Sequence, residues 1–132
     1  MTPPLRLGRV IVDLRARDLD RAVAFYSDVL GLPLLRRAAA WAALGAEGAE
    51  IHLYLHGGAT EGLEFRVEDV DRAVAALREH GVETIEGREE PDLIWRQPNG
   101  VRVFTWGRIA EFRDSEGNRL ALVEEAPPGG AV

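Results

Sequence analysis

The sequence predicts an α+β fold built from two similar modules, and three observations support this prediction. Residues 12–25, VDLRARDLDRAVAF, recur at residues 63–76 as LEFRVEDVDRAVAA, so that Asp18 corresponds to Asp69. Each copy begins with the alternation of a half-buried strand and continues with the spacing of an amphipathic helix. Short alternating segments separated by turn residues follow each helix. Two copies are too few for a solenoid, so we expect a pseudo-symmetric pair of strand–helix–strand modules.

The first module, residues 9–58, is predicted to contain one helix among several strands. Residues 9–16 alternate between apolar and polar side chains and predict a strand. Asp18 is a suitable N-cap for the helix that follows, and Gly31 is a natural residue at its end. Residues 34–46 would suit a helix by composition, but the repeat favours two short strands at 34–37 and 40–45. Residues 50–56 alternate again and predict the last strand.

The second module, residues 61–125, repeats this plan with additional residues before its last strand. A strand at 63–67 precedes a helix that Asp69 caps and Gly81 ends. Asn99–Gly100 predicts a hairpin turn. The segments 107–112 and 118–124 predict two antiparallel strands around the turn at 114–117. Residues 126–132 are expected to form a poorly ordered tail, and the whole chain, residues 1–132, is expected to be one domain.

The composition argues against several functional classes. The net charge of −6 argues against binding to nucleic acid, which needs a basic surface. With no cysteine, the chain has neither a thiolate metal site nor a thiol nucleophile. All 16 basic residues are arginine, which excludes Schiff-base chemistry through a lysine. The first residues include no long apolar run, so we expect no signal peptide, no membrane span and a cytoplasmic location.

The helix motif DLDRAVAFYSDVLGL, together with FRDSEGNRLALVE near the end of the chain, resembles the vicinal oxygen chelate superfamily. This superfamily includes glyoxalase I, bleomycin-resistance proteins, extradiol dioxygenases and fosfomycin-resistance enzymes. The resemblance extends over residues 9–125. It implies paired βαβββ modules that form a cupped mixed sheet with helices on the outer face, usually completed in a homodimer.

The resemblance also implies where a metal would be bound in metal-dependent members of the superfamily. These positions lie on the first and last strands of each module and correspond here to Ile11, His52, Gly62 and Ala121. Only His52 can coordinate a metal, whereas a stable site needs about three protein ligands. We therefore expect no metal and no other cofactor.

Other polar side chains share a sheet face with His52, and we call this the cup face. Alternation places Asp13, Tyr54 and Glu64 there, and Glu111 joins them if its neighbours face the helices. These side chains could form a displaced metal site or an acid–base group of His52 with Asp13 or Glu64. The simplest interpretation is that they form ordinary ion pairs with arginines on the same face, namely Arg15, Arg66 and Arg113.

We expect a small-molecule-binding protein that sequesters its ligand, as the resemblance to bleomycin-resistance proteins implies. The acidic charge suits a cationic ligand, and three tryptophans, Trp41, Trp95 and Trp106, could supply aromatic walls for a flat one. The alternative is a glyoxalase- or dioxygenase-like lyase or isomerase that uses His52 and cup carboxylates, with or without a displaced divalent metal. The residues expected to contact the ligand are Asp13, His52, Tyr54, Glu64, Trp95, Trp106 and Glu111.

Overall fold

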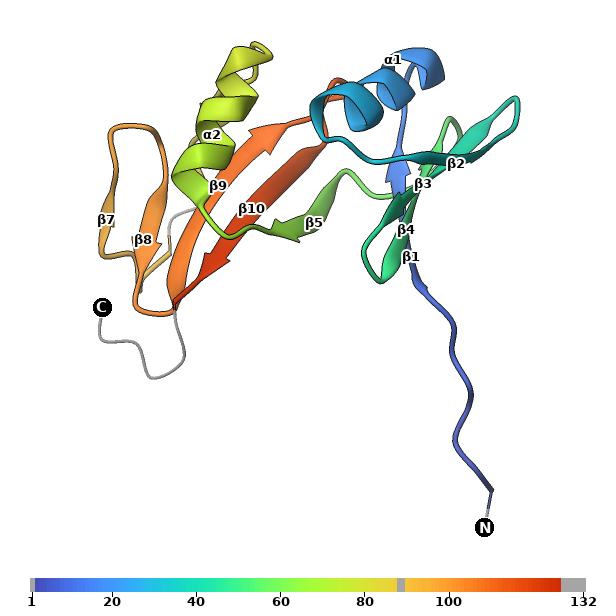
Figure 1. The fold of residues 1–132 in the computed structure, drawn as a ribbon, viewed down its shortest axis with the longest axis horizontal. Helices are drawn as coiled ribbons and strands as arrows, with labels where there is room; N and C mark the ends of the chain where they lie inside the picture. The colour runs from blue at the N-terminus through green and yellow to red at the C-terminus, as the bar shows by residue number, and fades with distance from the viewer. Residues whose placement is uncertain (1, 88–89, 127–132) are drawn as a thin grey trace. The chain divides into compact units, whose positions relative to one another are not determined.

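The structure, a computed structural model, describes residues 2–87 and 90–126. The chain divides into two compact units, Met1–Ala59 (unit 1) and Thr60–Val132 (unit 2). The described residues form two α-helices, one π-helical turn and ten strands (Figure 1), which confirms the predicted α+β class. Apart from Ala126, the predicted tail lies outside the described residues, and the prediction of a single domain stays a prediction.

Unit 1 contains a four-stranded mixed sheet in the order β1-β4-β3-β2. Strand β1 runs parallel to β4, and the other neighbours are antiparallel. The two strands favoured within residues 34–46 are confirmed, and the helix that their composition would allow does not form. The strands are β1 (Val10–Arg15), β2 (Leu34–Arg37), β3 (Trp41–Ala46) and β4 (Ala49–Tyr54).

Helix α1 (Leu19–Ala24) begins at the predicted cap, because the Asp18 carboxylate accepts the Arg21 N–H at 3.0 Å. It continues directly as the π-helical turn η1 (Phe25–Val29), in which the Leu30 N–H donates to the Phe25 carbonyl at 3.2 Å. The apolar spacing predicted one continuous helix and did not indicate this wider turn. Gly31, at φ +75°, ends the segment where the sequence predicts.

Unit 2 repeats the arrangement with a longer sheet, in the order β5-β10-β9-β8-β7, and β6 pairs with β9. Strand β5 runs parallel to β10, as β1 does to β4, and the other pairs are antiparallel. The predicted hairpin around Asn99–Gly100 joins β7 to β8. The strands are β5 (Glu61–Arg66), β6 (Thr84–Ile85), β7 (Trp95–Arg96), β8 (Arg102–Phe104), β9 (Gly107–Arg113) and β10 (Arg119–Glu125).

Helix α2 (Val70–Glu79) lies over β9 and β10 (Figure 1) and buries Val70, Val74 and Leu77. Its predicted cap is confirmed, since the Asp69 carboxylate accepts the Arg72 N–H at 3.1 Å. Neither α1 nor α2 has the length and apolar content that crossing a membrane requires, and no other helix among the described residues does.

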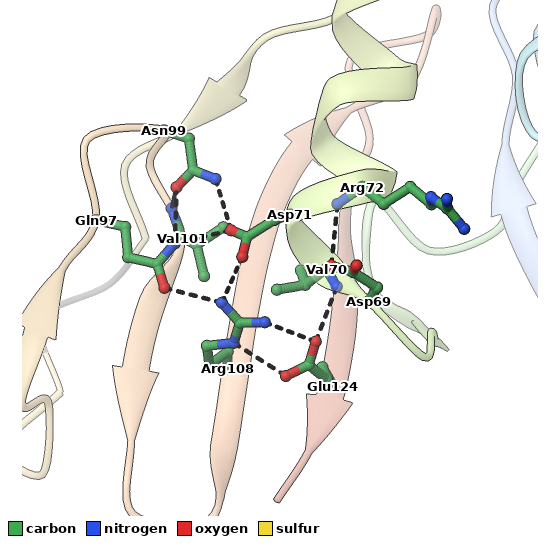
Figure 2. A network of polar contacts seen from close by, with 9 residues as sticks. All are labelled: Asp69, Val70, Asp71, Arg72, Gln97, Asn99, Val101, Arg108 and Glu124. Atoms are coloured by element: carbon green, nitrogen blue, oxygen red, sulfur yellow. Dashed lines mark hydrogen bonds and ion pairs between the residues drawn. The ribbon is translucent and has the colours of Figure 1, made fainter.

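A polar network joins the start of α2 to the sheet beneath it (Figure 2). Arg108 of β9 is at its centre and donates to Glu124 of β10 at 2.8 and 3.0 Å, and to Asp71 of α2 at 2.7 Å. Glu124 also accepts the N–H of Val70, the first residue of the helix, at 3.0 Å. The hairpin residue Gln97 accepts from Arg108 at 3.0 Å and donates to Asp71 at 2.8 Å. One guanidinium therefore connects a helix, two strands and a hairpin.

The network changes the ionisation of its members. Hydrogen bonds from Arg108 lower the pKa of Asp71 and of Glu124, and the backbone N–H of Val70 further lowers the pKa of Glu124. The carboxylates in turn raise the pKa of Arg108. Because both carboxyl pKa values are lower in the folded chain than in the unfolded chain, the network stabilises the fold above the ordinary carboxyl pKa. That stabilisation is lost as the pH falls through the lowered values.

We predict that Arg108→Met lowers the free energy of unfolding by about 2 kcal/mol at pH 7, because hydrogen bonds between charged groups are lost and two carboxylates keep fewer partners. The difference between the wild type and the variant should shrink as the pH falls from about 5 to 3, because the carboxylates become protonated. Urea unfolding at several pH values measures both effects.

The matched control is Arg66→Met, which removes an ion pair with Glu125 whose side chains are 73% and 53% exposed. Its cost should stay below about 0.5 kcal/mol. Equal losses in the two variants, or a difference that does not depend on pH, would contradict the role assigned to Arg108.

Candidate functional site

Unit 1 brings three predicted site residues together on its cup face. Asp13 of β1 lies opposite His52 of β4, and Tyr54 is two residues further along β4. Side chains opposite each other in paired strands point to the same face, so Asp13 and His52 are neighbours there. Strand β3 adds Trp41, which lies opposite Tyr54. The parallel pairing of β1 with β4 therefore gathers residues that are far apart in the sequence.

Trp41, His52 and Tyr54 form an aromatic cluster on this face. The His52 ring stacks on Trp41 with 5.4 Å between centroids and 29° between planes. Tyr54 lies 6.3 Å from Trp41 and 6.1 Å from His52. His52 is only 8% exposed, whereas the other two side chains are half-buried. The cluster thus presents a partly accessible aromatic wall, of the kind that suits a flat ligand.

Glu50 forms a hydrogen bond with His52. Its Oε1 lies 3.0 Å from Nε2 of His52 and 2.5 Å from Nη2 of Arg36. The hydrogen bond with His52, followed by that with Arg36, lowers the pKa of Glu50, so this group is a carboxylate at neutral pH. A carboxylate only accepts, so Nε2 carries the hydrogen and Nδ1 of a neutral His52 is the acceptor. The predicted partners of His52 were Asp13 and Glu64, and sequence reasoning missed Glu50.

Unit 2 places two further predicted residues in one row across its cup face. Glu64 of β5 and Glu111 of β9 lie on either side of Ala121 of β10. They line a cavity of about 440 Å³, which we call the carboxylate pocket. Its walls also include Glu61, Glu90 and Arg119, and its floor includes Ile109 and Ala121.

The two predicted carboxylates of this pocket, Glu64 and Glu111, differ in their ion pairs with arginines. Glu111 is 12% exposed and accepts from Arg102 at 2.9 Å and from Arg119 at 3.0 Å. It is therefore neutralised by arginines, although not by Arg113, the partner that alternation suggested. The Glu64 side chain is exposed and forms no ion pair with any residue in 2–87 or 90–126. Glu64 is thus the more available carboxylate for a cationic group.

Arg102 is an arginine that the sequence gave no reason to bury, yet its side chain is 1% exposed. Besides Glu111, it contacts Glu90 at 3.2 Å, and its guanidinium lies 5.9 Å from the centre of the Phe104 ring. The backbone of Gly87 packs directly on the guanidinium, because a Cβ at that position would lie 2.0 Å from Cζ. Arg102 therefore holds the segment that contributes Glu90 to the pocket.

Three of the four positions at which the family resemblance implies metal ligands carry residues that cannot coordinate a metal through their side chains. Ile11 lies opposite Glu50, and Ala121 is a 5% exposed floor residue. Gly62 lies in the irregular part of β5, at φ +102°. Within residues 2–87 and 90–126, no three histidine, aspartate or glutamate side chains are arranged so that they could hold a metal ion. The displaced metal site considered from the sequence therefore has no candidate ligand set among these residues.

Of the two remaining predicted residues, Trp95 lies apart from the carboxylate pocket by strand register, whereas Trp106 stacks on Phe104, which packs with the floor residues Ile109 and Ala121. Trp95 pairs with Val103, which pairs with Arg108, so Trp95 belongs by register to the opposite face from Glu111. Trp106 lies in the turn after β8, 41% exposed, and stacks on Phe104 with 5.1 Å between ring centroids. Their contact with a ligand stays a prediction.

The fold agrees with that of a known family. The chain belongs to the Glyoxalase/Bleomycin resistance protein/Dioxygenase superfamily, whose family model matches residues 6–122. No curated protein matches the sequence.

Three solved structures illustrate the range of this fold. TnmS3, an antibiotic binding protein from Streptomyces sp. CB03234, is 25% identical, with a TM-score of 0.66, over 93% of this chain and 100% of its own. A lactoylglutathione lyase from Agrobacterium tumefaciens is 22% identical, with a TM-score of 0.66, over 93% and 96%. TioX from Micromonospora sp. ML1 is 22% identical, with a TM-score of 0.65, over 89% and 98%.

We predict that Gly87→Ala destabilises unit 2, because the added methyl group fits only if the backbone shifts or if the buried Arg102 guanidinium moves and weakens its ion pairs with Glu90 and Glu111. The expected loss in the free energy of unfolding is about 2 kcal/mol, within the range for overpacked positions. Gly57→Ala is the matched control, since a Cβ there meets nothing within 4 Å. Denaturant unfolding of both variants tests this prediction, and a wild-type midpoint for Gly87→Ala would contradict the packing described.

Proposed function

We propose that this chain is a small-molecule-binding protein that holds a planar organic cation on the cup face without a bound metal. The aromatic cluster of unit 1 is the observation on which the proposal rests. An accessible Trp41–Tyr54 wall around a buried histidine offers stacking and cation–π contacts. The printed description of TnmS3 as an antibiotic binding protein supports the same class of function.

Charge favours a cation over an anion. Asp13 neighbours His52 by register and has an exposed carboxylate. The carboxylate pocket of unit 2 adds Glu64, and the whole chain carries a net charge of −6. We propose two separate sets of ligand contacts, each within its own unit: Asp13, His52 and Tyr54 on the cup face of unit 1, and Glu64 and Glu111 in the carboxylate pocket of unit 2. A homodimeric state and a cytoplasmic location belong to the same proposal and rest on the sequence and on the family resemblance.

A defined set of dyes tests this proposal. Proflavine is planar and cationic at pH 7.5, acridine is planar and neutral, and fluorescein is an anion with a planar xanthene ring and a pendant carboxyphenyl group. We expect proflavine to bind most tightly in calorimetric titrations, to quench tryptophan fluorescence and to raise Tm. Trp41→Leu should raise the Kd for proflavine about tenfold, the equivalent of one cation–π contact.

The charge contribution needs its own variants. Asp13→Asn and Glu64→Gln should each weaken proflavine binding more than acridine binding, whereas Glu79→Gln, which removes an exposed carboxylate from helix α2, should change neither. Titrations with EDTA and with added Zn²⁺ should give the same Kd. Preferential binding of fluorescein, or binding that requires the metal, would rule out the proposal in this form.

The contact between His52 and Glu50 favours a second candidate, a glyoxalase-like isomerase or lyase. A histidine whose Nε2–H is held by a carboxylate has Nδ1 available as a general base. In that case, the protein should isomerise the hemithioacetal of methylglyoxal and glutathione, and His52→Gln should lower kcat about 100-fold. No turnover above the uncatalysed rate, with or without added divalent metal, would exclude this activity and leave the binding protein.

A further inference from the structure

The ring of His52 has one polar atom, Nδ1, that the fold leaves without a partner. His52 is only 8% exposed, and its one hydrogen bond joins Nε2 to Oε1 of Glu50 at 3.0 Å. No residue in 2–87 or 90–126 forms a hydrogen bond with Nδ1. Within the same part of the chain, no side-chain nitrogen or oxygen is both shielded from solvent and without a partner. Nδ1 is therefore the polar atom through which an otherwise enclosed ring reaches solvent.

Glu50 determines the hydrogen-bonding role of Nδ1. Its Oε1 also accepts from Arg36 at 2.5 Å, and a carboxylate can only accept. The hydrogen of the neutral ring must therefore lie on Nε2, which leaves a lone pair on Nδ1. Trp41 stacks on the same ring and, together with Glu50, holds it in this orientation. The cup face of unit 1 thus presents a fixed hydrogen-bond acceptor at this point.

Asp13 adds a second acceptor beside the first. Asp13 and His52 lie opposite each other in paired strands, and such strands are about 4.8 Å apart. Asp13 is exposed, and its carboxylate forms no hydrogen bond or ion pair with any residue in 2–87 or 90–126. Two groups that only accept hydrogen bonds therefore lie side by side, next to the wall formed by Trp41 and Tyr54.

We propose that the cup face of unit 1 selects organic cations whose positive charge is carried by N–H groups, such as protonated aminoheterocycles and amidines, over quaternary and fully N-alkylated cations. This inference rests on the proposed function and names the class of cation that is bound. An aromatic wall alone would accept either class, because cation–π attraction needs no hydrogen on the cation. The two acceptors distinguish the classes, since an N–H cation can donate to both His52 and Asp13.

The burial of His52 gives it the larger share of this selectivity. A flat ligand that covers the aromatic cluster displaces water from Nδ1, and an N–H on the ligand replaces the lost hydrogen bond. An N-alkyl group in the same place leaves the acceptor buried and unpaired, which is unfavourable. The exposed carboxylate of Asp13 keeps its water beside either class of cation and attracts both through its charge. Asp13 therefore favours cations in general, whereas His52 selects among them.

Proflavine and N-methyl acridine orange test the selectivity. Both are planar acridinium cations, but the second has methyl groups in place of every N–H hydrogen of the first. Calorimetric titration of the full chain should give a Kd about tenfold lower for proflavine, the size of one charged hydrogen bond. His52→Phe keeps a ring that can stack on Trp41 but has no acceptor, so its two Kd values should become similar. His80→Phe, at an exposed histidine after helix α2, is the matched control and should change neither Kd.

Nuclear magnetic resonance tests the position of the hydrogen on His52 without a substitution at that residue. The chain has three histidines, and replacing the exposed His56 and His80 by glutamine leaves His52 as the one source of imidazole signals. Long-range proton–nitrogen correlation spectra distinguish a ring nitrogen that has a lone pair from one that carries a hydrogen. In the free chain, Nδ1 should have the lone pair and Nε2 the hydrogen. Proflavine should shift the Nδ1 signal, and N-methyl acridine orange should shift it much less.

The outcomes separate this inference from the proposed function. If neither dye binds, the proposed function fails and the selectivity fails with it. If both dyes bind the wild type with similar Kd values, or if the preference for proflavine survives His52→Phe, the binding protein stands and this inference is overturned. A hydrogen on Nδ1 in the free chain overturns it as well, because the ring would then present a donor to the cation.

Discussion

The parallel pairing of a first and a last strand is the constraint on which each unit depends. β1 pairs with β4 and β5 pairs with β10 in this way, and no short hairpin can close a parallel pair. The connection must instead pass over one face of the sheet, and it contains the helix that covers that face. The caps Asp18 and Asp69 start these helices directly after the first strand. What remains open is the other face, and polar residues occupy it.

A polar sheet face has to neutralise its own charges, and the two units do so differently. In unit 1, Glu50 is shared between Arg36 and a histidine that is itself stacked on Trp41. In unit 2, Arg102 is buried between Glu90 and Glu111. Recruiting Glu111 for a ligand would break its buried ion pair with Arg102, at a cost of about 3–5 kcal/mol. Carboxylates outside these pairs, Asp13 and Glu64, can meet a ligand at lower cost.

The sequence allowed the elements and their faces to be predicted, because caps, end glycines and alternation are local signals. The row of Asp13 and His52 followed from alternation together with the family topology. The contact of Glu50 with His52 was within reach, since the two residues share parity, but Arg36 comes from an irregular strand whose register no local pattern shows. The burial of Arg102 could not be predicted from the sequence. It depends on the distant backbone of Gly87 packing on a guanidinium that alternation would leave exposed.

The low accessibility of the His52 ring bears on both proposed functions, the small-molecule-binding protein and the isomerase or lyase. The Nε2–H of His52 donates to Glu50, and Trp41 stacks on one face of the ring. The remaining polar atom of the ring is Nδ1, and His52 is only 8% exposed. A base in this position can act only on a molecule already seated against the aromatic cluster. Both proposed functions therefore require that a small molecule first binds against the aromatic cluster, and catalysis would be a further step. Under either proposal, the shape and charge of the cup face, more than the basicity of one histidine, would select the molecule that is bound.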